Sequence, residues 1–567
     1  MRTHYSYLLL LLLLGLTQSL SAQALYTIPD LHYGVEPATG FRLVRLDLAA
    51  VNADPTLTAG VVIDGTEYRF ASPRATLDHE ATYPVFVDGA AAGTLAFTTL
   101  PLINVTLPDS LSRTEHGPGT FTYADDSTTV SSVVGVRHRG SYSTMFPKQS
   151  LDLEFWEDAA TEESRDVSFP GLREDDDWIM DAVYNEPLRV NSYVAHKLWL
   201  DMNEVPHREE EPDAKSCADV LLAEAFVDGT YTGVYLLSEQ VDRKQLKLKK
   251  FRDGEIRGEL YKAEHWSDAT RLRGTAPLSE AEGDDWAGWE MKLPDPDDTL
   301  HWNKLFDLID YIVNSSDEDF TNTVTERLDL DNLIDYQIFL NALRMGDNTG
   351  KNTYLARYNQ ETPYFYVPWD LDVSFGNRFN GENMGSFRGW LTNGLYERLN
   401  ALSPDFYNSR LCRRYEELRT DLLRTDVLGQ RLDAAVAYLR DNGVYAREGT
   451  VFPESLNVSP AQLDFTDWFV SNRLNWLDDQ ICALSTSVMS EGEAPRFTLF
   501  PNPASQRILV RWPTGARTEY AISTIGGRRV LSGTLEGPET PISLTGLPRG
   551  MYLLTLEGKS RIFVIGR

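Results

Sequence analysis

Three residues near the middle of the chain have side chains that could hold a divalent cation beside a phosphate. Asp347 is followed five positions later by Asn352, and Asp370 comes after two runs of aromatic residues. Carboxylate and amide oxygens are the ligands that Mg²⁺ prefers in proteins. A turn or a helix cap is the structural alternative for Asp347 and Asp370, and for nearby Asp372 it is as good an explanation as a metal ligand.

The residues between Asn352 and Asp370 are typical of an antiparallel hairpin. Two aromatic runs within 353–367 flank a short polar turn. Asn352 and Asp370 are equally far from residue 361, and this register would place them opposite each other, about 5 Å apart. We therefore predict that the open end of the hairpin gathers Asn352 and Asp370, and that Asp347 enters just before it.

The five-residue step from Asp347 to Asn352 also occurs in protein kinases, where the aspartate receives the proton of a substrate hydroxyl. In those enzymes the asparagine and a later aspartate hold Mg²⁺. The step alone is common in acidic sequences, and no His-Arg pair precedes Asp347. The predicted hairpin is what makes a cation and phosphate site the better interpretation.

Phosphate chemistry also needs cations, and two lysines and a glutamate are candidates. Lys148 precedes an apparent strand, Lys262 ends another, and Glu239 could pair with a lysine that faces phosphate. An exposed lysine on a strand ordinarily does no more than add to solubility, and this is the alternative for both lysines.

The candidate residues lie in a long segment, 101–485, in which strand patterns come first and helical patterns come later. This order is typical of the α+β class, and at this length the domain is a large one. The expected strands are 133–136, 150–155 and a hairpin around Asp228-Gly229, and the expected helices are 188–202, 302–314, 331–345, 406–441 and 465–485.

The segments on either side differ in composition. Residues 1–24 have one arginine, an apolar run and then small residues, the order of a secretory signal peptide. No later apolar run of about twenty residues predicts a membrane span in the mature chain. Residues 25–100 indicate short strands in a small β domain with a structural or orienting role. The small, polar and acidic stretch 486–495 is typical of a linker, and 496–567 returns to short strands.

The composition limits the partners that can be expected. The 567 residues include 84 acids and 53 lysines and arginines, a net charge of −31, so general binding to nucleic acid is not expected. The three cysteines, Cys217, Cys412 and Cys482, form no CxxC pair, which argues against a thiolate zinc site. One disulfide would leave an odd thiol, and the spacing does not specify which pair forms.

An ordered set of motifs over roughly 101–485 resembles the CotH family of atypical kinases, named after spore coat protein H. The motifs are R-G-S-x-S and P-K-Q-S-L-D-L, W-I-M-D-A-x-Y-N-E-P-L-R-V-N, G-x-Y-x-G-V-Y-L-L-S-E-Q-V-D-R, L-Y-K, D-N-T-G-K-N and P-W-D-L-D-V-S-F-G. The resemblance implies an atypical protein-kinase-like core that binds ATP and Mg²⁺ in a cleft and transfers phosphate to Ser or Thr hydroxyls.

The resemblance also implies a role for each candidate residue. The roles are the catalytic aspartate for Asp347, metal ligands for Asn352 and Asp370, the phosphate-contacting lysine for Lys148, the partner of that lysine for Glu239, and a place near the nucleotide for Lys262. The family often has R-G-N-S where this chain has Arg139-Gly-Ser-Tyr. This difference falls in the segment expected to cover the phosphates.

The end of the chain resembles the C-terminal sorting domain (type A) of the type IX secretion system. Its motifs are F-P-N-P-A at 500–504, I-G-G-R-R-V at 525–530 and L-P-R-G-M-Y-L-L at 547–554. The resemblance implies Sec export to the periplasm, passage through the type IX secretion machinery, and release or surface attachment once the tail is removed. A plain carbohydrate-binding β module is the alternative.

Together these features predict a secreted or cell-surface atypical Ser/Thr kinase that uses ATP and Mg²⁺ on an unknown protein substrate. The expected fold is an α+β, kinase-like core between a small N-terminal β domain and a C-terminal β-sandwich. One alternative is a non-catalytic surface binding protein or adhesin, a pseudokinase, because ATP is scarce outside cells. Another is transfer of a different group, such as AMP, at the same metal site.

Overall fold

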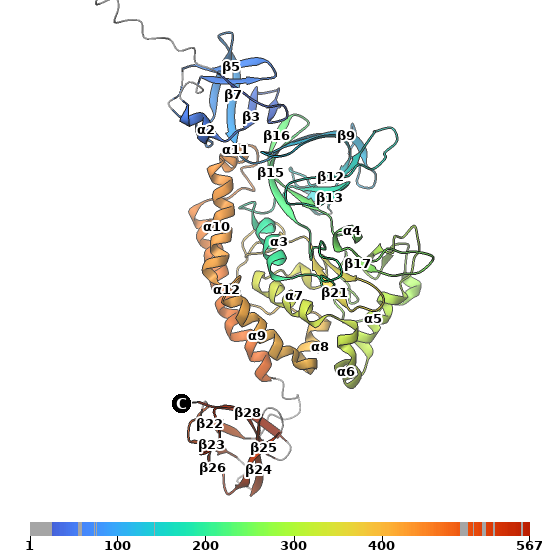
Figure 1. Cartoon of the computed structure of the whole chain (residues 1–567), viewed down its shortest axis with the longest axis vertical. Coiled ribbons are helices and arrows are strands. Elements are labelled where there is room, and N and C mark those ends of the chain that lie inside the picture. Colours follow the sequence, from blue (N-terminus) through green and yellow to red (C-terminus); the bar gives the residue numbers. More distant parts are fainter. Residues whose placement is uncertain are drawn as a thin grey trace, which may run out of the picture. The chain divides into compact units, whose positions relative to one another are not determined.

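The computed structural model describes residues 25–567 except 55–58, 73, 75, 141, 488–496, 503, 513–516, 525–527, 557–558 and 567 (Figure 1). The expected signal peptide at 1–24 and most of the expected linker at 486–495 lie outside the described residues. The chain divides into two compact units, Met1–Ser485 and Thr486–Arg567. The first unit contains both helices and strands, which confirms the α+β class.

The first sheet is formed by the short strands that were expected within 25–100. The strands are Tyr26–Thr27 (β1), Tyr33–Glu36 (β2), Phe41–Arg45 (β3), Gly60–Ile63 (β4), Thr66–Phe70 (β5), Tyr83–Val87 (β6) and Ala90–Thr98 (β7). They lie in the order β1-β4-β5-β6-β7-β3-β2. Apolar side chains such as Val44, Val85 and Leu95 form its core, together with the short helix Leu48–Ala53 (α2).

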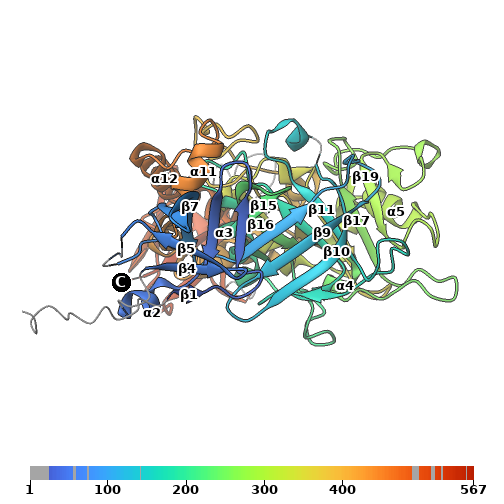
Figure 2. The same cartoon turned by 90° about the horizontal axis from the view of Figure 1, so that it is seen from above.

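A closed barrel of seven strands follows. The strands are Leu102–Thr106 (β8), Gly117–Ala124 (β9), Thr129–His138 (β10), Leu151–Trp156 (β11), Asp177–Asp181 (β14), Val220–Val227 (β15) and Thr230–Glu239 (β16), in the order β10-β11-β14-β16-β15-β8-β9. Figure 2 shows β9, β10 and β11 side by side. Phe121, Phe155 and Trp178 fill the interior. The expected strands 133–136 and 150–155 and the hairpin around Asp228-Gly229 are confirmed. A short pair, Val167–Ser168 (β12) with Glu174–Asp175 (β13), forms a separate sheet.

A five-stranded sheet, called the second sheet below, carries the predicted hairpin. Its strands are Glu259–Ala263 (β17), Asp285–Trp286 (β18), Trp289–Leu293 (β19), Thr353–Arg357 (β20) and Tyr364–Pro368 (β21), in the order β18-β19-β17-β20-β21. Helix Leu330–Leu343 (α7) packs on β21 and is buried on nearly all sides. The Asn332 amide on α7 donates to the Tyr366 carbonyl at 3.0 Å and accepts from the Tyr366 N–H at 2.8 Å, so the helix fixes the position of the hairpin.

The other helices surround this sheet and border the barrel (Figure 1). They are Asn191–Met202 (α3), Arg243–Leu246 (α4), Asn303–Asn314 (α5), Asp317–Arg327 (α6), Gly394–Leu402 (α8), Tyr407–Arg419 (α9), Thr425–Asp441 (α10), Val444–Val451 (α11) and Pro460–Ser487 (α12). The expectation of one helix over 406–441 is wrong. The chain turns at Thr420 and Asp421, two weak helix formers, and the Leu423 N–H closes back on the Leu418 carbonyl at 2.8 Å.

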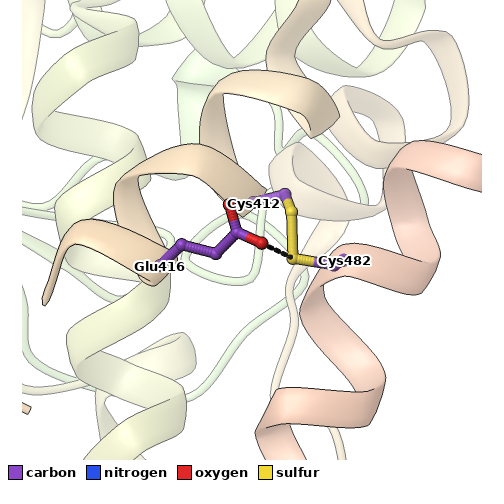
Figure 3. A group of neighbouring side chains, drawn as sticks. All are labelled: Cys412, Glu416 and Cys482. Atoms are coloured by element: carbon purple, nitrogen blue, oxygen red, sulfur yellow. Dashed lines mark hydrogen bonds between the residues drawn. A yellow bond between two sulfur atoms is a disulfide. The ribbon is translucent and has the colours of Figure 1, made fainter. Parts of the chain in front are cut away.

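A disulfide joins α9 to α12 through Cys412 and Cys482, which resolves the pairing that spacing left open. The Glu416 carboxylate, one turn along α9 from Cys412, lies 4.0 Å from the Cys482 sulfur (Figure 3). Because the two sulfurs are bonded to each other, Cys412 and Cys482 link the two helices covalently, and Glu416 lies beside this link. Cys217 is the odd thiol and is buried.

The second compact unit is a small β-sandwich. Its strands are Thr498–Phe500 (β22), Arg507–Arg511 (β23), Thr518–Thr524 (β24), Arg529–Leu535 (β25), Glu539–Ser543 (β26), Gly550–Leu556 (β27) and Lys559–Ile565 (β28). They form two sheets, β22-β23-β26 and β25-β24-β27-β28. One apolar cluster that includes Ile508, Ile522 and Leu554 lies between them. Buried and exposed residues alternate along strands such as β23 and β26, as expected for a strand with one face in the core.

Candidate active site

A cavity of about 540 Å³ lies between the barrel and the second sheet. Its walls come from the ends of β10, β11, β14 and β16 on one side, and from β17, β19 and residues 347–372 on the other. This volume is within the range of small-molecule sites. Of the six residues predicted from sequence, four line the cavity, namely Asp347, Asn352, Asp370 and Lys262.

The hairpin that brings Asn352 and Asp370 together is confirmed, but its predicted register is wrong by one residue. Thr353 pairs with Pro368, so continuing this register by one residue places Trp369, and not Asp370, opposite Asn352. In regular strands a one-residue slip points two side chains to opposite faces. Asn352 and Asp370 avoid this because both have left-handed backbones, with φ of 54° and 56°. Asparagine and aspartate tolerate this conformation better than most residues, and both side chains reach the same cavity.

Asn348, which sequence reasoning missed, ties the open end of the hairpin together. Its buried amide nitrogen donates to the Asn352 carbonyl at 2.7 Å and to the Trp369 carbonyl at 2.8 Å. The Tyr336 hydroxyl on α7 donates to the Asn348 carbonyl at 3.2 Å. An asparagine inside the D-N-T-G-K-N motif was the available clue. One buried side chain thus fixes the two metal-ligand candidates relative to each other.

Three of the carboxylates that line this cavity lie close enough for their charges to affect one another. Asp370 and Asp372 follow the hairpin, and Asp181 comes from the end of β14. Surrounding protein atoms and then the charge of Asp181 raise the pKa of Asp370, although its side chain still meets the solvent of the cavity. Burial and the charge of Asp370 raise the pKa of Asp372 well above its usual value, and a 2.5 Å hydrogen bond from Asn185 opposes that rise. Mutual repulsion of this kind favours a bound cation.

The donor set fits Mg²⁺. Carboxylate oxygens of Asp370 and Asp372 and the amide oxygen of Asn352 are hard ligands, and no cysteine is among the described residues that line the cavity. Two histidines, His138 and His196, line the cavity as well, and the buried His196 ring lies against Trp369. The oxygen donors of Asn352, Asp370 and Asp372 are therefore suited to a divalent cation such as Mg²⁺.

Asp347 stands at the start of a single 3₁₀ turn, Asp347–Thr349. Its side chain is half-buried and makes no hydrogen bond or ion pair within the described residues. Burial raises the pKa of Asp347, and the charge of Lys351 opposes that rise. A carboxylate without a fixed partner, open to a cavity, is free to accept a proton from a ligand.

Lys148 is not in the cavity, contrary to its expected contact with phosphate. Its ammonium is fully buried, lies 3.0 Å from Glu448 on α11 and donates to the Val234 carbonyl. Arg189 donates to the same Glu448 oxygen at 2.8 Å, and the Val234 N–H donates to the other at 2.9 Å. Burial lowers the pKa of Lys148 to about 8 despite the charge of Glu448. The partner lies far away in the sequence, so no local pattern could identify it.

The expectation that Glu239 pairs with Lys148 is also wrong. The Glu239 carboxylate accepts from the Lys215 ammonium at 2.7 Å and from the backbone N–H groups of Arg173 and Asp219 at 2.7 and 3.0 Å. These bonds hold Glu239 at the end of β16, where it closes a structural network and does not line the cavity.

The cavity has other cations. Arg137 and Arg139 both reach Asp152, at 3.2 and 3.5 Å, and Arg139 also stacks over the Trp369 ring. Lys262 pairs with Glu264 and lies 4.0 Å from Glu290, and Lys292 pairs with Glu290 at 2.5 Å. Lys351 differs from these, because its ammonium makes no ion pair or hydrogen bond within the described part of the chain. It lies close enough to Asp347 and Asp370 for its charge to oppose the rise in their pKa values.

Aromatic side chains border the opening. Tyr142, on the 3₁₀ turn Tyr142–Met145, contacts Phe379 with ring centres 5.3 Å apart. Both rings are about half exposed, at 47% and 52%. The segment expected to cover the phosphates therefore lines the cavity and meets the loop after Asp372 at its rim.

Known families match two parts of the chain. The CotH kinase protein family matches residues 136–477, and the secretion system C-terminal sorting domain matches residues 498–565. Inner spore coat protein H of Bacillus subtilis (strain 168) is 21% identical over 253 residues, which are 45% of this chain and 62% of that protein. The chain thus matches less than two thirds of that relative. Among the described residues, no helix is long and apolar enough to cross a membrane.

Proposed function

The chain belongs to the CotH kinase protein family, and we propose that it is an exported kinase that transfers the γ-phosphate of ATP to a Ser or Thr hydroxyl of another protein. The observation that carries the proposal is the arrangement around Asn348. Its two hydrogen bonds fix Asn352 and Asp370 beside Asp347 in one cavity. Protein kinases use an acid, an amide and a second acid in this order for phosphoryl transfer.

Each residue has a defined task in this proposal. Asn352 and Asp370, with help from Asp372, hold Mg²⁺, which supplies charge neutralisation at the ATP phosphates when bound. Asp347 orients the acceptor hydroxyl and takes its proton as the hydroxyl oxygen bonds to the γ-phosphorus and the bond to ADP breaks. These tasks follow the roles that the resemblance to the CotH family implies for Asp347, Asn352 and Asp370.

Lys351 is the cation that we assign to the transferred phosphate, in place of Lys148. The other cavity lysines have carboxylate partners, whereas Lys351 has none among the described residues and lies near both Asp347 and Asp370. A half-buried cation without a partner gains most from an anionic ligand. Arg139 and Lys262 border the same space and contribute a weaker field because Asp152 and Glu264 already neutralise them.

The sorting domain at 498–565 marks the chain as a secreted or cell-surface protein that uses the type IX secretion machinery. Sec export through a signal peptide at 1–24 is part of the proposal. The substrate is therefore expected among proteins that meet this chain outside the cytoplasm.

The test is transfer of label from γ-labelled ATP to extracellular proteins of the same cell, with Mg²⁺ present. We expect labelling by the wild type and none by Asp347→Asn or Asp370→Asn. Asp426→Asn is the matched control, because that exposed aspartate pairs with Arg424 and is not among the residues that line the cavity. Equal labelling by all four proteins would refute the mechanism.

The same experiment separates the alternative functions. Label transferred from α-labelled ATP, but not from γ-labelled ATP, would indicate AMP transfer. A wild type that neither labels any protein nor gains thermal stability from millimolar ATP with Mg²⁺ would indicate a non-catalytic surface binder, since a ligand of the folded state must raise stability.

A further inference from the structure

Three arginines near the cavity have almost no carboxylate partners. They are Arg344 at the end of α7, and Arg378 and Arg388 on the loop that follows Asp372; together they are called the arginine patch here. Within the described residues, the sole ion pair of the patch joins Arg378 to Glu382, at 3.9 Å between two half-exposed side chains. Arg388 stacks over its neighbour Phe387 and has no acidic partner.

This lack of partners contrasts with many other arginines of the same unit. With 84 acids and 53 lysines and arginines, carboxylates are plentiful, and many arginines of this unit form ion pairs, although others, such as Arg473, bond to backbone carbonyls instead. Examples of the ion pairs are Arg414 with Asp335 and Arg419 with Asp478, both at 2.7 Å. An acidic protein in which three nearby arginines share a single long ion pair has a local positive surface against its own net charge.

The patch is held in place from beneath. The Arg344 guanidinium donates to the Arg388 carbonyl at 3.1 Å, and burial and the charge of Arg378 lower the pKa of Arg344. Arg473 on α12 is fully buried and donates to the carbonyls of Phe387 and Gly389, both at 2.8 Å. These bonds fix the backbone on both sides of Arg388, and the exposed Arg388 side chain extends from this fixed backbone.

Two members of the patch are close along the chain to residues that line the cavity. Arg344 precedes Asp347 by three residues, and three peptide units span at most about 11 Å. Arg378 is next to Phe379, whose ring lines the cavity at its rim. A peptide that presents a hydroxyl to Asp347 would therefore pass the patch within about three residues of that hydroxyl.

We propose that the protein substrate is acidic around its acceptor hydroxyl, and that Arg344, Arg378 and Arg388 bind a carboxylate or phosphate side chain within about three residues of it. Guanidinium groups bind both anions in a bidentate manner, so an acidic residue and a previously phosphorylated one share the required chemistry. This inference rests on the proposed kinase function, because it assigns that site its substrate class.

The test is binding of short fluorescent peptides with one serine flanked by glutamate, glutamine or lysine, measured by anisotropy with the full chain. A peptide with phosphoserine beside the acceptor forms a fourth arm and distinguishes the two anions. We expect the glutamate or phosphoserine peptide to bind at least about tenfold more tightly than the glutamine peptide. Arg378→Glu/Arg388→Glu should abolish that preference, whereas Arg388→Lys should retain most of it. Arg424→Glu, at an exposed arginine outside the patch, is the matched control.

Equal binding of acidic and neutral peptides, or a preference that survives the double charge reversal, would overturn the proposal. Patch-dependent binding to anionic but not neutral lipid vesicles, without binding of acidic peptides, would overturn it in favour of a membrane surface. Thermal unfolding of each variant checks that the fold is intact. Because anisotropy needs no phosphate transfer, failure of the proposed kinase activity would leave this binding result readable.

Discussion

Two lysines in this molecule have opposite surroundings. Lys148 is fully buried, and Glu448, Arg189 and the backbone of Val234 complete a network in which every charge has a partner. Lys351 lies at the cavity, close to Asp347 and Asp370, and has no ion pair within the described residues. The network around Lys148 stabilises the barrel, whereas the positive charge of Lys351 has no protein partner there and can pair with a ligand. In this chain, unmatched charge is therefore the better indicator of function than burial.

The largest effect should come from breaking the matched network. Glu448→Gln leaves Lys148 and Arg189 buried without a counter-charge, so we expect the free energy of unfolding to fall by about 3–5 kcal/mol. Urea unfolding of the first compact unit measures it. Glu417→Gln, at a half-exposed glutamate, is the control and should change stability by under about 0.5 kcal/mol. A loss no larger than that of the control would show that the network is not structural.

Lys351→Met should have the converse effect. We expect kcat for phosphate transfer to fall about a hundredfold, near 2.7 kcal/mol, because a charge aimed at the transferred phosphate is lost. The free energy of unfolding should stay within about 0.5 kcal/mol of the wild type. Lys351→Arg should restore most activity, and Lys292→Met, which removes a lysine already paired with Glu290, serves as the comparison. Similar losses of kcat in Lys351→Met and Lys292→Met would contradict the distinction between a lysine without an ion pair and a lysine that has one.

The pH profile tests how these unmatched charges act on one another. Burial raises the pKa of Asp347, so kcat/KM should fall on the acid side as Asp347 gains a proton and can no longer accept one. Lys351 opposes that rise, so Lys351→Met should move the acid limb to higher pH, by about 1 unit. Lys351→Arg should leave the limb in place. An acid limb that stays fixed or moves to lower pH in Lys351→Met would show that the charge of Lys351 does not lower the pKa of Asp347.

The smallest effect should come from relieving repulsion in the carboxylate group. Asp372→Asn removes one negative charge beside Asp370, so the chain without Mg²⁺ should gain on the order of 1 kcal/mol in unfolding free energy. Mg²⁺ should then stabilise the variant less than it stabilises the wild type. Thermal unfolding with and without Mg²⁺ measures both quantities, with Asp426→Asn as a control. Equal stabilisation of wild type and variant by Mg²⁺ would exclude Asp372 from the cation site.

Sequence reasoning was successful where the site is built from one continuous segment. Asp347, Asn352 and Asp370 lie around a single hairpin, so local patterns predicted that they meet. The predicted register was wrong by one residue because the loop at 358–363 is not symmetrical about residue 361. The left-handed backbones of Asn352 and Asp370, which bring both side chains to one cavity despite this slip, cannot be predicted from sequence spacing.

Contacts between distant segments could not be predicted in the same way. Lys148 and Glu239 each carry a charge suited to phosphate chemistry, and their partners, Glu448 and Lys215, appear only when the barrel is assembled. Asp181 was part of a recognised motif, but its position beside Asp370 depends on how β14 enters the barrel. The arginine patch likewise depends on a loop that α12 holds through Arg473.

The Lys148–Glu448 pair also constrains the order in which the chain can fold. Its two residues are 300 positions apart, and Arg189 is 259 positions from the same carboxylate. In a chain delivered from its N-terminus, both cations emerge long before Glu448, and until then burying them is too costly for the barrel to close. Helix α11, which carries Glu448, is therefore needed before the barrel can close. A chain that ends before α11 should keep an open barrel that proteases and chaperones can reach.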